Sequence, residues 1–365
     1  MPVIVFILVL SILILVHEIG HFLAARKMGI KVEEFGIGYP PKIWGKKIGE
    51  TIYSINLLPL GGFVRLYGEQ TEEGVANPKE AFVNKSKKAR FLVLTAGVIM
   101  NFILAIAAFS IVYTFQGIPR DTDKVIVSGI APDSPAALSG ISPEDVITSV
   151  DEVKITTIND FVKLVEEKKG KEIELGVLQP KKGETNITIT PRVNPPEGEG
   201  PLGVAITQTE IYFPPLWQRP FLGIYNGFKD AIYWGRTVLG GLGIMVFNLF
   251  RGVVPKDVTG PVGIYAITTE VSKFGILSII NFLGIFSVNL AIINILPFPA
   301  LDGGRLVFVI VEKFTGRKVI PRVEAAIHTI GMVILLTLML VITYLDAKRL
   351  ISAGSISGFL ENAVK

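Results

Sequence analysis

Residues 13–30 have the sequence LILVHEIGHFLAARKMGI, and this stretch decides the fold. It continues an apolar run that begins at Met1, yet it contains His17, Glu18 and His21. Ionisable groups inside a membrane helix are costly and are generally functional. A spacing of four residues puts both imidazoles on one helix face, where they can bind one zinc ion while the glutamate acts as general base. The stretch therefore predicts a zinc site within a membrane helix.

The alternative for the two histidines is packing or hydrogen bonding within the protein. The whole chain has only three histidines, and two of them fall at this spacing with a glutamate between them. The apolar surroundings also favour a functional role, because unpaired ionisable groups are rare in lipid. Metal binding is thus the better interpretation of the motif.

Composition supports a membrane protein. Half of the 365 residues are hydrophobic, and the mean hydropathy is +0.52. A membrane-spanning helix needs about 20 apolar residues, and four segments meet this requirement: 2–25, 91–118, 274–301 and 325–345. A cleaved signal peptide is the alternative for the first segment, but no basic region precedes it and no small-residue cleavage site closes it.

The chain contains no cysteine, which excludes disulfides, thiolate nucleophiles and cysteine-bound zinc. The net charge is only +4, and the basic residues cluster beside the apolar segments, at 26–31, 85–90 and 313–322. This placement favours lipid head groups over nucleic acid as their partner. By the positive-inside rule the three clusters are cytoplasmic. Both termini and the long 119–273 region are then expected outside the cytoplasm.

The segments between the apolar stretches have distinct characters. Residues 50–69, ETIYSINLLPLGGFVRLYGE, alternate apolar and polar side chains before Gly61 and Gly62, which predicts a β-hairpin at the membrane. Residues 119–208 are richer in charge and predict a small α+β domain, with a helix in TINDFVKLVEEKKG, 157–170. Residues 209–273 predict amphipathic helices on the outer membrane face, with a fifth crossing as the alternative.

A tetrahedral zinc site needs a third protein ligand. His328 lies in the last apolar segment, in largely apolar surroundings. Asp302 is the better candidate, because it closes the third segment in NLAIINILPFPALDGGRLVF, residues 289–308. Pro297 and Pro299 interrupt the helix just before it. A broken helix with a carboxylate at membrane depth is typical of a polar cavity, and a turn or cap residue is the structural alternative.

Together, HEIGH and NILPFPALDGG resemble the site-2 protease family of intramembrane zinc metalloproteases, and within it the bacterial regulator of sigma-E protease group. The resemblance covers nearly the whole chain. It implies that His17, His21 and Asp302 bind Zn²⁺, that Glu18 is catalytic and that Asn294 contacts the substrate backbone. It also implies that the hairpin around Gly61 and Gly62 binds an unwound substrate strand. A hydrogen bond between membrane helices is the alternative role for Asn294.

Further motifs extend the resemblance. GVIMNF at 97–102 matches a family pattern through Gly97, expected to allow close helix packing, and Asn101, to which we assign no catalytic role. TGPVGI at 259–264 matches a motif whose role the sequence does not explain. Residues 130–155 and PLGVAI at 201–206 resemble bacterial PDZ domains, and the chain has room for one such domain.

The sequence therefore predicts a polytopic α-helical membrane protein with about four transmembrane helices, a membrane-associated β-hairpin and an inserted extracytoplasmic α+β PDZ domain. The predicted parts are transmembrane helix 1 (1–27), the hairpin loop on the cytoplasmic side (28–89), transmembrane helix 2 (90–118), the PDZ domain (119–208), amphipathic surface helices (209–273), transmembrane helix 3 (274–302), a cytoplasmic loop (303–324), transmembrane helix 4 (325–346) and a C-terminal tail (347–365).

The expected function is regulated intramembrane proteolysis in the bacterial inner membrane. The expected substrates are single-span membrane proteins, either pre-trimmed anti-sigma factors or remnant signal peptides, and the expected surroundings are the lipid bilayer. A membrane-anchored PDZ adaptor without proteolytic activity is the main alternative, although it does not explain HEIGH or Asp302. A metal transporter is a third class, but internal repeats typical of transporters are not evident. The sequence makes no prediction of oligomeric state.

Overall fold

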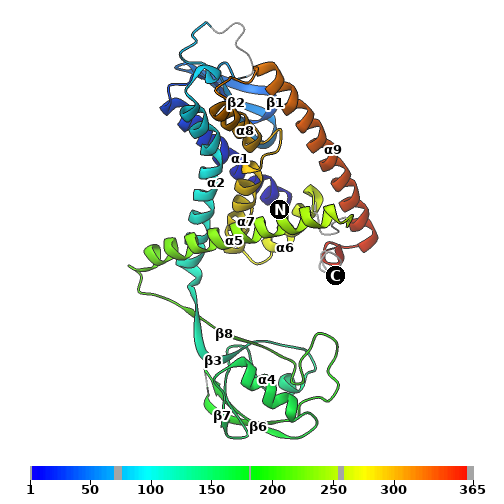
Figure 1. The fold of residues 1–365 in the computed structure, drawn as a ribbon. Helices are drawn as coiled ribbons and strands as arrows, with labels where there is room; N and C mark the ends of the chain where they lie inside the picture. Colours follow the sequence, from blue (N-terminus) through cyan, green and yellow to red (C-terminus); the bar gives the residue numbers. More distant parts are fainter. Residues whose placement is uncertain (1, 70–75, 181, 254–258, 360–365) are drawn as a thin grey trace. The chain divides into compact units, whose positions relative to one another are not determined.

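The computed structural model describes residues 2–69, 76–180, 182–253 and 259–359 (Figure 1). The chain divides into two compact units. Unit 1 combines Met1–Phe115 with Leu216–Lys365, and unit 2 is Gln116–Pro215. Each unit has its own core, and the boundary agrees with the change in composition near residue 119.

Four helices of unit 1, among the described residues, are long and apolar enough to cross a membrane: α1 (Pro2–Lys27), α2 (Lys87–Gln116), α7 (Ile276–Ile295) and α9 (Pro321–Ala353). They correspond to the four predicted segments. Helix α7 ends earlier than the apolar segment because Pro297 and Pro299 cannot continue it.

Two apolar clusters hold the central helices together. Helices α1 and α7 meet through Val9, Leu13 and Phe282, all buried. Helices α2 and α7 meet through Phe109 and Val288, where α5 also joins. The central helices are therefore fixed by packing, which gives polar groups on α1 a defined position relative to α2 and α7.

Two differences from the predicted boundaries concern α8 (Asp302–Thr315) and α9. The segment 303–324, predicted as a loop, is largely helical, because its apolar residues recur on one face and bury Leu306 and Val309. Helix α9 continues beyond residue 346 into the predicted tail. Its last turns carry Lys348 and Arg349, and both residue types are good helix formers.

A buried ion pair fixes α8 against α2. Arg90 donates to the Glu312 carboxylate at 2.7 Å, and both residues are almost completely buried. Lys87 donates to the Glu312 carbonyl at 2.7 Å. These contacts orient the helix that begins at Asp302.

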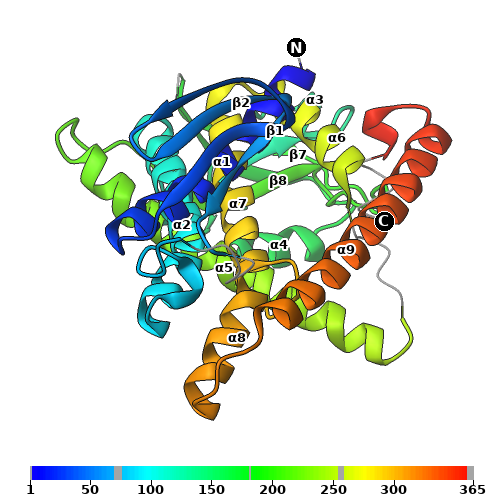
Figure 2. The same cartoon turned by 90° about the horizontal axis from the view of Figure 1, so that it is seen from above.

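The predicted hairpin is larger than the sequence pattern suggested, and its turn lies elsewhere. Strand β1 (Val32–Ile48) and strand β2 (Thr51–Leu66) meet at a turn around residues 49–50, so Gly61 and Gly62 lie within β2. Residues 34–37 have partners in both halves of β2, namely 52–55 and 62–65. The outer edge of 62–66 has no strand partner among the described residues. Figures 1 and 2 show the sheet lying against α1.

Helices α5 (Arg219–Phe250) and α6 (Pro261–Ser272) occupy most of the segment predicted as surface helices. The TGPVGI motif forms the start of α6. There the buried Asp346 carboxylate of α9 accepts hydrogen bonds from the backbone N–H groups of Gly260, at 2.8 Å, and Gly263, at 3.1 Å. A carboxylate is well suited to this place, because a helix start presents unpaired donors and partial positive charge. The motif thus fastens α6 to α9.

The strands of unit 2 are β3 (Ile118–Ile130), β4 (Val146–Val150), β5 (Val153–Lys154), β6 (Ile173–Gln179), β7 (Gly183–Ile189) and β8 (Val204–Tyr212). The sheet order is β7-β6-β4-β3-β8, with β5 paired to β4.

Two helices complete the described part of unit 2, the short α3 (Pro135–Leu138) and α4 (Ile158–Glu167). Thr157 caps α4 by accepting from the Asp160 N–H at 3.1 Å. The helix predicted within 157–170 is therefore present, and the cap chemistry explains its start.

Candidate metal centre and active site

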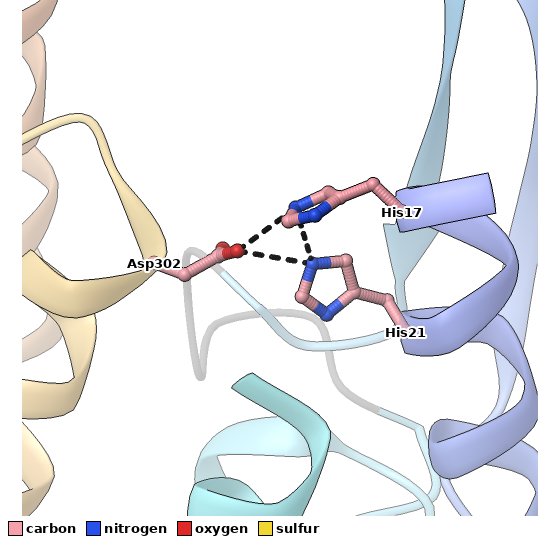
Figure 3. Close-up of side chains that lie close together, drawn as sticks. All are labelled: His17, His21 and Asp302. Carbon is pink, nitrogen blue, oxygen red and sulfur yellow. Dashed lines mark hydrogen bonds and ion pairs between the residues drawn. The ribbon is translucent and has the colours of Figure 1, made fainter. Parts of the chain in front are cut away.

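The three predicted metal ligands lie together in unit 1. His17 and His21 project from one face of α1, and Asp302 from the first position of α8 (Figure 3). The His17 Nε2 atom lies 3.0 Å from Asp302 Oδ2. The His21 Nε2 atom lies 3.2 Å from the same oxygen and 3.1 Å from His17 Nε2. Both histidines are buried, so three ligand atoms from distant parts of the chain converge inside the protein.

The spacing of these atoms suits zinc. Tetrahedral ligands at zinc–ligand distances of 2.0–2.1 Å lie about 3.3–3.4 Å from one another, close to the separations seen here. His328, the weaker candidate, lies outside this group: its Nδ1 accepts from the Ala300 N–H at 3.0 Å. The donor set is thus two imidazoles and one carboxylate, which zinc accepts readily.

Helix α2 closes the site from one side through Gly97. A Cβ atom there would lie 2.5 Å from His21 Nε2 and 2.6 Å from His17 Cε1. No side chain larger than hydrogen fits between α2 and these two rings. Gly97 therefore has a more specific role than the close helix packing expected from its motif.

The outer nitrogens of both rings also face α2. His21 Nδ1 lies 2.8 Å from the Val93 carbonyl oxygen, and His17 Nδ1 lies 3.3 Å from the Asn101 side-chain amide. A carbonyl oxygen can only accept, so His21 Nδ1 carries a proton, which leaves Nε2 as the nitrogen that can bind a metal. That is the form in which an imidazole binds a metal through Nε2.

Glu18 lies next to the donor atoms. It lines a cavity of about 190 Å³ together with His17, His21 and Asp302. Val64 and Leu66, from the unpaired edge of β2, line the same cavity. A carboxylate, a metal-binding donor set and an open strand edge therefore share one cavity.

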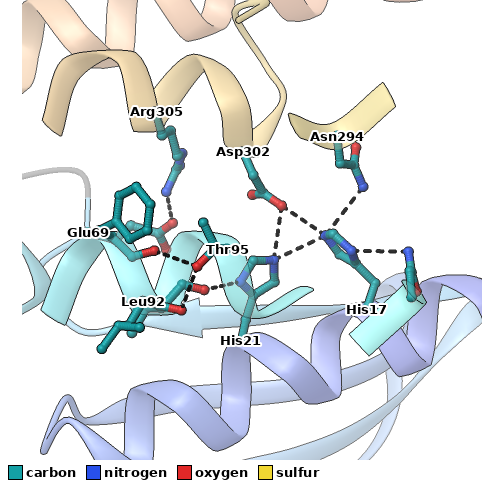
Figure 4. Close-up of polar contacts among 11 residues, drawn as sticks. His17, His21, Glu69, Leu92, Thr95, Asn294, Asp302 and Arg305 are labelled. Atoms are coloured by element: carbon teal, nitrogen blue, oxygen red, sulfur yellow. Dashed lines mark hydrogen bonds and ion pairs between the residues drawn. The ribbon is translucent and has the colours of Figure 1, made fainter. Parts of the chain in front are cut away.

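Asn294, predicted to contact substrate, lies beside the donor set in the last turns of α7. Its Nδ2 is 3.4 Å from His17 Nε2 (Figure 4). When that nitrogen binds a metal, it can no longer accept from Asn294, so the amide becomes free to donate to another acceptor.

Gly61 and Gly62 pack against α1 just before the HEIGH motif. Gly61 has φ +80°, and a Cβ there would lie 2.6 Å from Ile14 Cδ1. A Cβ on Gly62 would lie 2.7 Å from the Gly36 carbonyl oxygen. Both glycines are buried. Gly61 allows β2 to approach α1 closely, and Gly62 allows it to pair closely with β1.

Sequence reasoning missed a charged pair beside the site. Arg305 of α8 donates to the carboxylate of Glu69, just after β2, and both residues line the cavity that holds Glu18 (Figure 4). The negative charge of Glu69 raises the pKa of Arg305 against the opposing effect of burial. Arg305 stands three residues after Asp302, which places it on the same helix face, but nothing in the sequence identified Glu69 as its partner.

The site combines an HExxH motif on one helix with a carboxylate from a distant part of the chain, in a unit with four apolar helices. These features define a membrane-embedded zinc metallohydrolase. The sequence model of peptidase family M50 matches residues 5–338. The chain belongs to this family, which is the site-2 protease family, and it is a zinc metalloprotease of the membrane. This membership decides between the expected classes in favour of the protease.

Relatives match over almost their full length. A Clostridium perfringens protein named as a zinc metalloprotease is 35% identical over 349 residues, covering 95% of this chain and 98% of its own. The zinc metalloprotease RasP of Oceanobacillus iheyensis is 30% identical over 435 residues, covering 95% and 99%. The regulator of sigma-W protease RasP of Bacillus subtilis is 29% identical over 426 residues, covering 95% and 98%.

A solved structure, the PDZ domain of the SdrC-like protein from Listeria monocytogenes, covers 24% of this chain and 92% of its own. Its sequence identity is 21% and its TM-score 0.22, which is too low to support an assignment of fold.

Proposed function

We propose that His17, His21 and Asp302 bind the zinc ion and that Glu18 is the general base of an intramembrane peptidase. The observation that carries the proposal is the convergence of three donor atoms, from two buried histidines and one partly buried aspartate, 3.0–3.2 Å apart, in the cavity that Glu18 lines. Bound zinc would polarise the scissile carbonyl and lower the pKa of a water molecule.

Glu18 performs the proton transfers. Its position between the two ligand histidines puts its carboxylate at the donor set, where it takes a proton from water and later gives it to the leaving amine. The burial of the site limits the access of bulk water, which strengthens the interactions of the carboxylate with the reacting groups.

The proposed substrates are single-span membrane proteins, such as pre-trimmed anti-sigma factors or remnant signal peptides. A peptide bond within a helix is shielded from attack, so the substrate has to unwind. The unpaired edge of residues 62–66 supports binding of an extended strand by edge addition, with Val64 and Leu66 facing the cavity. Gly61 allows this edge to lie close to α1, Gly62 allows it to lie close to β1, and Asn294 donates to the substrate backbone.

We further propose a multi-pass arrangement in the bacterial inner membrane with both termini and unit 2 outside the cytoplasm. The basic residues at 26–31, 85–90 and 313–322 support this orientation. The motif resemblance supports a PDZ role for unit 2, either binding a peptide C-terminus or restricting access to the protease.

The test is cleavage of a model single-span substrate by purified protein in detergent or liposomes. Glu18→Gln is expected to retain zinc and lose cleavage, whereas His21→Ala and Asp302→Ala are expected to lose both. Glu172→Gln, which changes an exposed carboxylate of unit 2, is the matched control and is expected to behave as wild type. Cleavage by the Glu18→Gln protein would refute the proposal. A purified wild-type protein that binds no zinc would also refute it.

A further inference from the structure

We infer that Asn101 is a positioning residue for the zinc ligand His17, with its side-chain oxygen accepting the ring Nδ1 proton. The inference rests on the proposed function, since it requires that His17 Nε2 bind the metal. Asn101 is the polar residue of GVIMNF, and it has no role in the sequence analysis or in the proposed mechanism. The inference assigns it one.

The direction of the His17 ring is the first step. Its Nε2 faces the donor set, 3.0 Å from Asp302 Oδ2 and 3.1 Å from His21 Nε2. Its Nδ1 faces away from that set, towards Asn101 of α2. An imidazole that binds a metal through one nitrogen carries its proton on the other. His17 Nδ1 is therefore a donor and needs an acceptor.

The Asn101 amide is the second step. Its Nδ2 is placed 3.3 Å from His17 Nδ1, while its Oδ1 is buried without a hydrogen-bond partner. Two donors cannot bond to each other. The oxygen and nitrogen of an amide are assigned from their hydrogen bonds and can be exchanged by a half-turn. That half-turn puts the acceptor opposite the ring proton.

The equivalent contact of His21 supports the same arrangement. Its Nδ1 meets the Val93 backbone oxygen, an acceptor whose identity is fixed, at 2.8 Å. Val93, Gly97 and Asn101 follow one another at intervals of four residues and so lie on one face of α2. This face provides a carbonyl for one ring, space for both rings and an amide oxygen for the other.

The position of Asn101 is itself fixed. The residue is completely buried, and its backbone carbonyl accepts from Ser287 Oγ of α7 at 2.7 Å. Ser287 therefore offers a matched control, because its hydrogen bond to the same residue goes to the backbone carbonyl and not to the side-chain amide.

The experiment measures zinc affinity by chelator competition, and thermal unfolding of the zinc-free protein, for wild type, Asn101→Leu, Asn101→Asp and Ser287→Ala. Leucine has similar size but no acceptor, so zinc binding is expected to weaken about 10- to 100-fold. Aspartate keeps an oxygen at the ring, so its affinity is expected within about threefold of wild type, as is that of Ser287→Ala. If Asn101→Leu does not fold, Asn101→Ala replaces it, with the same expected loss of affinity.

Three results would overturn the inference: unchanged affinity in the leucine or alanine protein, equal weakening in the aspartate protein, or weakening in Ser287→Ala as large as in Asn101→Leu. Equal weakening in the aspartate protein would show that an acceptor oxygen at this position does not support the ring, and weakening in Ser287→Ala would indicate packing rather than the acceptor. Failure of the proposed function looks different, because wild type itself would then bind no zinc and His17→Ala would change nothing.

Discussion

Adding one methyl group at Gly97 should disable the metal site without unfolding the protein. The Cβ of Gly97→Ala would lie 2.5 Å from His21 Nε2 and 2.8 Å from His17 Nε2. An ordinary van der Waals contact begins near 3.4 Å, so the His21 nitrogen would have to retreat by roughly 0.9 Å. The ring cannot turn freely, because its Nδ1 is held by the Val93 carbonyl.

The expected loss of zinc affinity follows from how little metal–ligand distances can vary and from the free-energy cost of crowding a packed interior. Metal–ligand distances in working sites stay within about 0.2 Å of their ideal values. Moving the His21 nitrogen by roughly 0.9 Å therefore disrupts the donor set. Crowding a packed interior costs about 1–3 kcal/mol, which corresponds to about 5- to 150-fold weaker zinc binding. The helix itself gains, since alanine stabilises a helix by about 1 kcal/mol relative to glycine.

The assay compares zinc affinity and zinc-free thermal unfolding in Gly97→Ala and Gly284→Ala. The second variant crowds the buried Phe109 ring, 2.7 Å from the added Cβ, and leaves the donor atoms alone. We expect weakened zinc binding and lost cleavage only in Gly97→Ala. Zinc affinity within threefold of wild type in Gly97→Ala would show that the site tolerates the methyl group and that the reasoning is wrong.

Three further predictions concern other parts of the chain. Asp346→Ala should lower stability by about 1–3 kcal/mol, because it leaves buried helix-start donors unpaired; unchanged thermal unfolding in detergent would contradict this. Glu69→Gln should destabilise the protein by breaking the Arg305 pair, and the double variant Glu69→Leu/Arg305→Met should recover stability in the same assay, since a partly buried charge that loses its partner costs more than an apolar pair. No recovery would count against it. The Glu174 N–H and the Lys168 charge lower the pKa of Asp151, so its stabilising contribution is complete above the ordinary aspartate value of about 3.9 and is lost as the pH falls through the lower folded value. Asp151→Asn should therefore flatten the acid limb of unfolding, and an unaltered pH profile would refute this.

Local chemistry made part of the structure predictable. A run of apolar residues long enough for a bilayer is a strong signal, and so is a histidine pair at helical spacing, so the four helices and the first two donor residues were apparent. Pro297 and Pro299 also predicted the interruption before Asp302. These features depend on residues close in sequence.

Features that depend on distant partners were not predictable. The pairing of residues 34–37 with two halves of β2 needs the tertiary arrangement, because alternation alone does not fix register. Glu69 and Arg305 are far apart in the chain, and neither carries a local signal of the other. Asn101 did carry a signal in its motif, but its role depends on which nitrogen of His17 faces the donor set.

The two edges of the β1–β2 sheet have different consequences for self-association. The edge at 42–48 is exposed and carries Lys46 and Lys47. Pro40 and Pro41 come immediately before it in β1. Lysine and proline on an edge strand discourage pairing with another chain. Pairing with a foreign strand is thereby discouraged at this edge, whereas the edge at 62–66, beside the cavity, carries neither lysine nor proline.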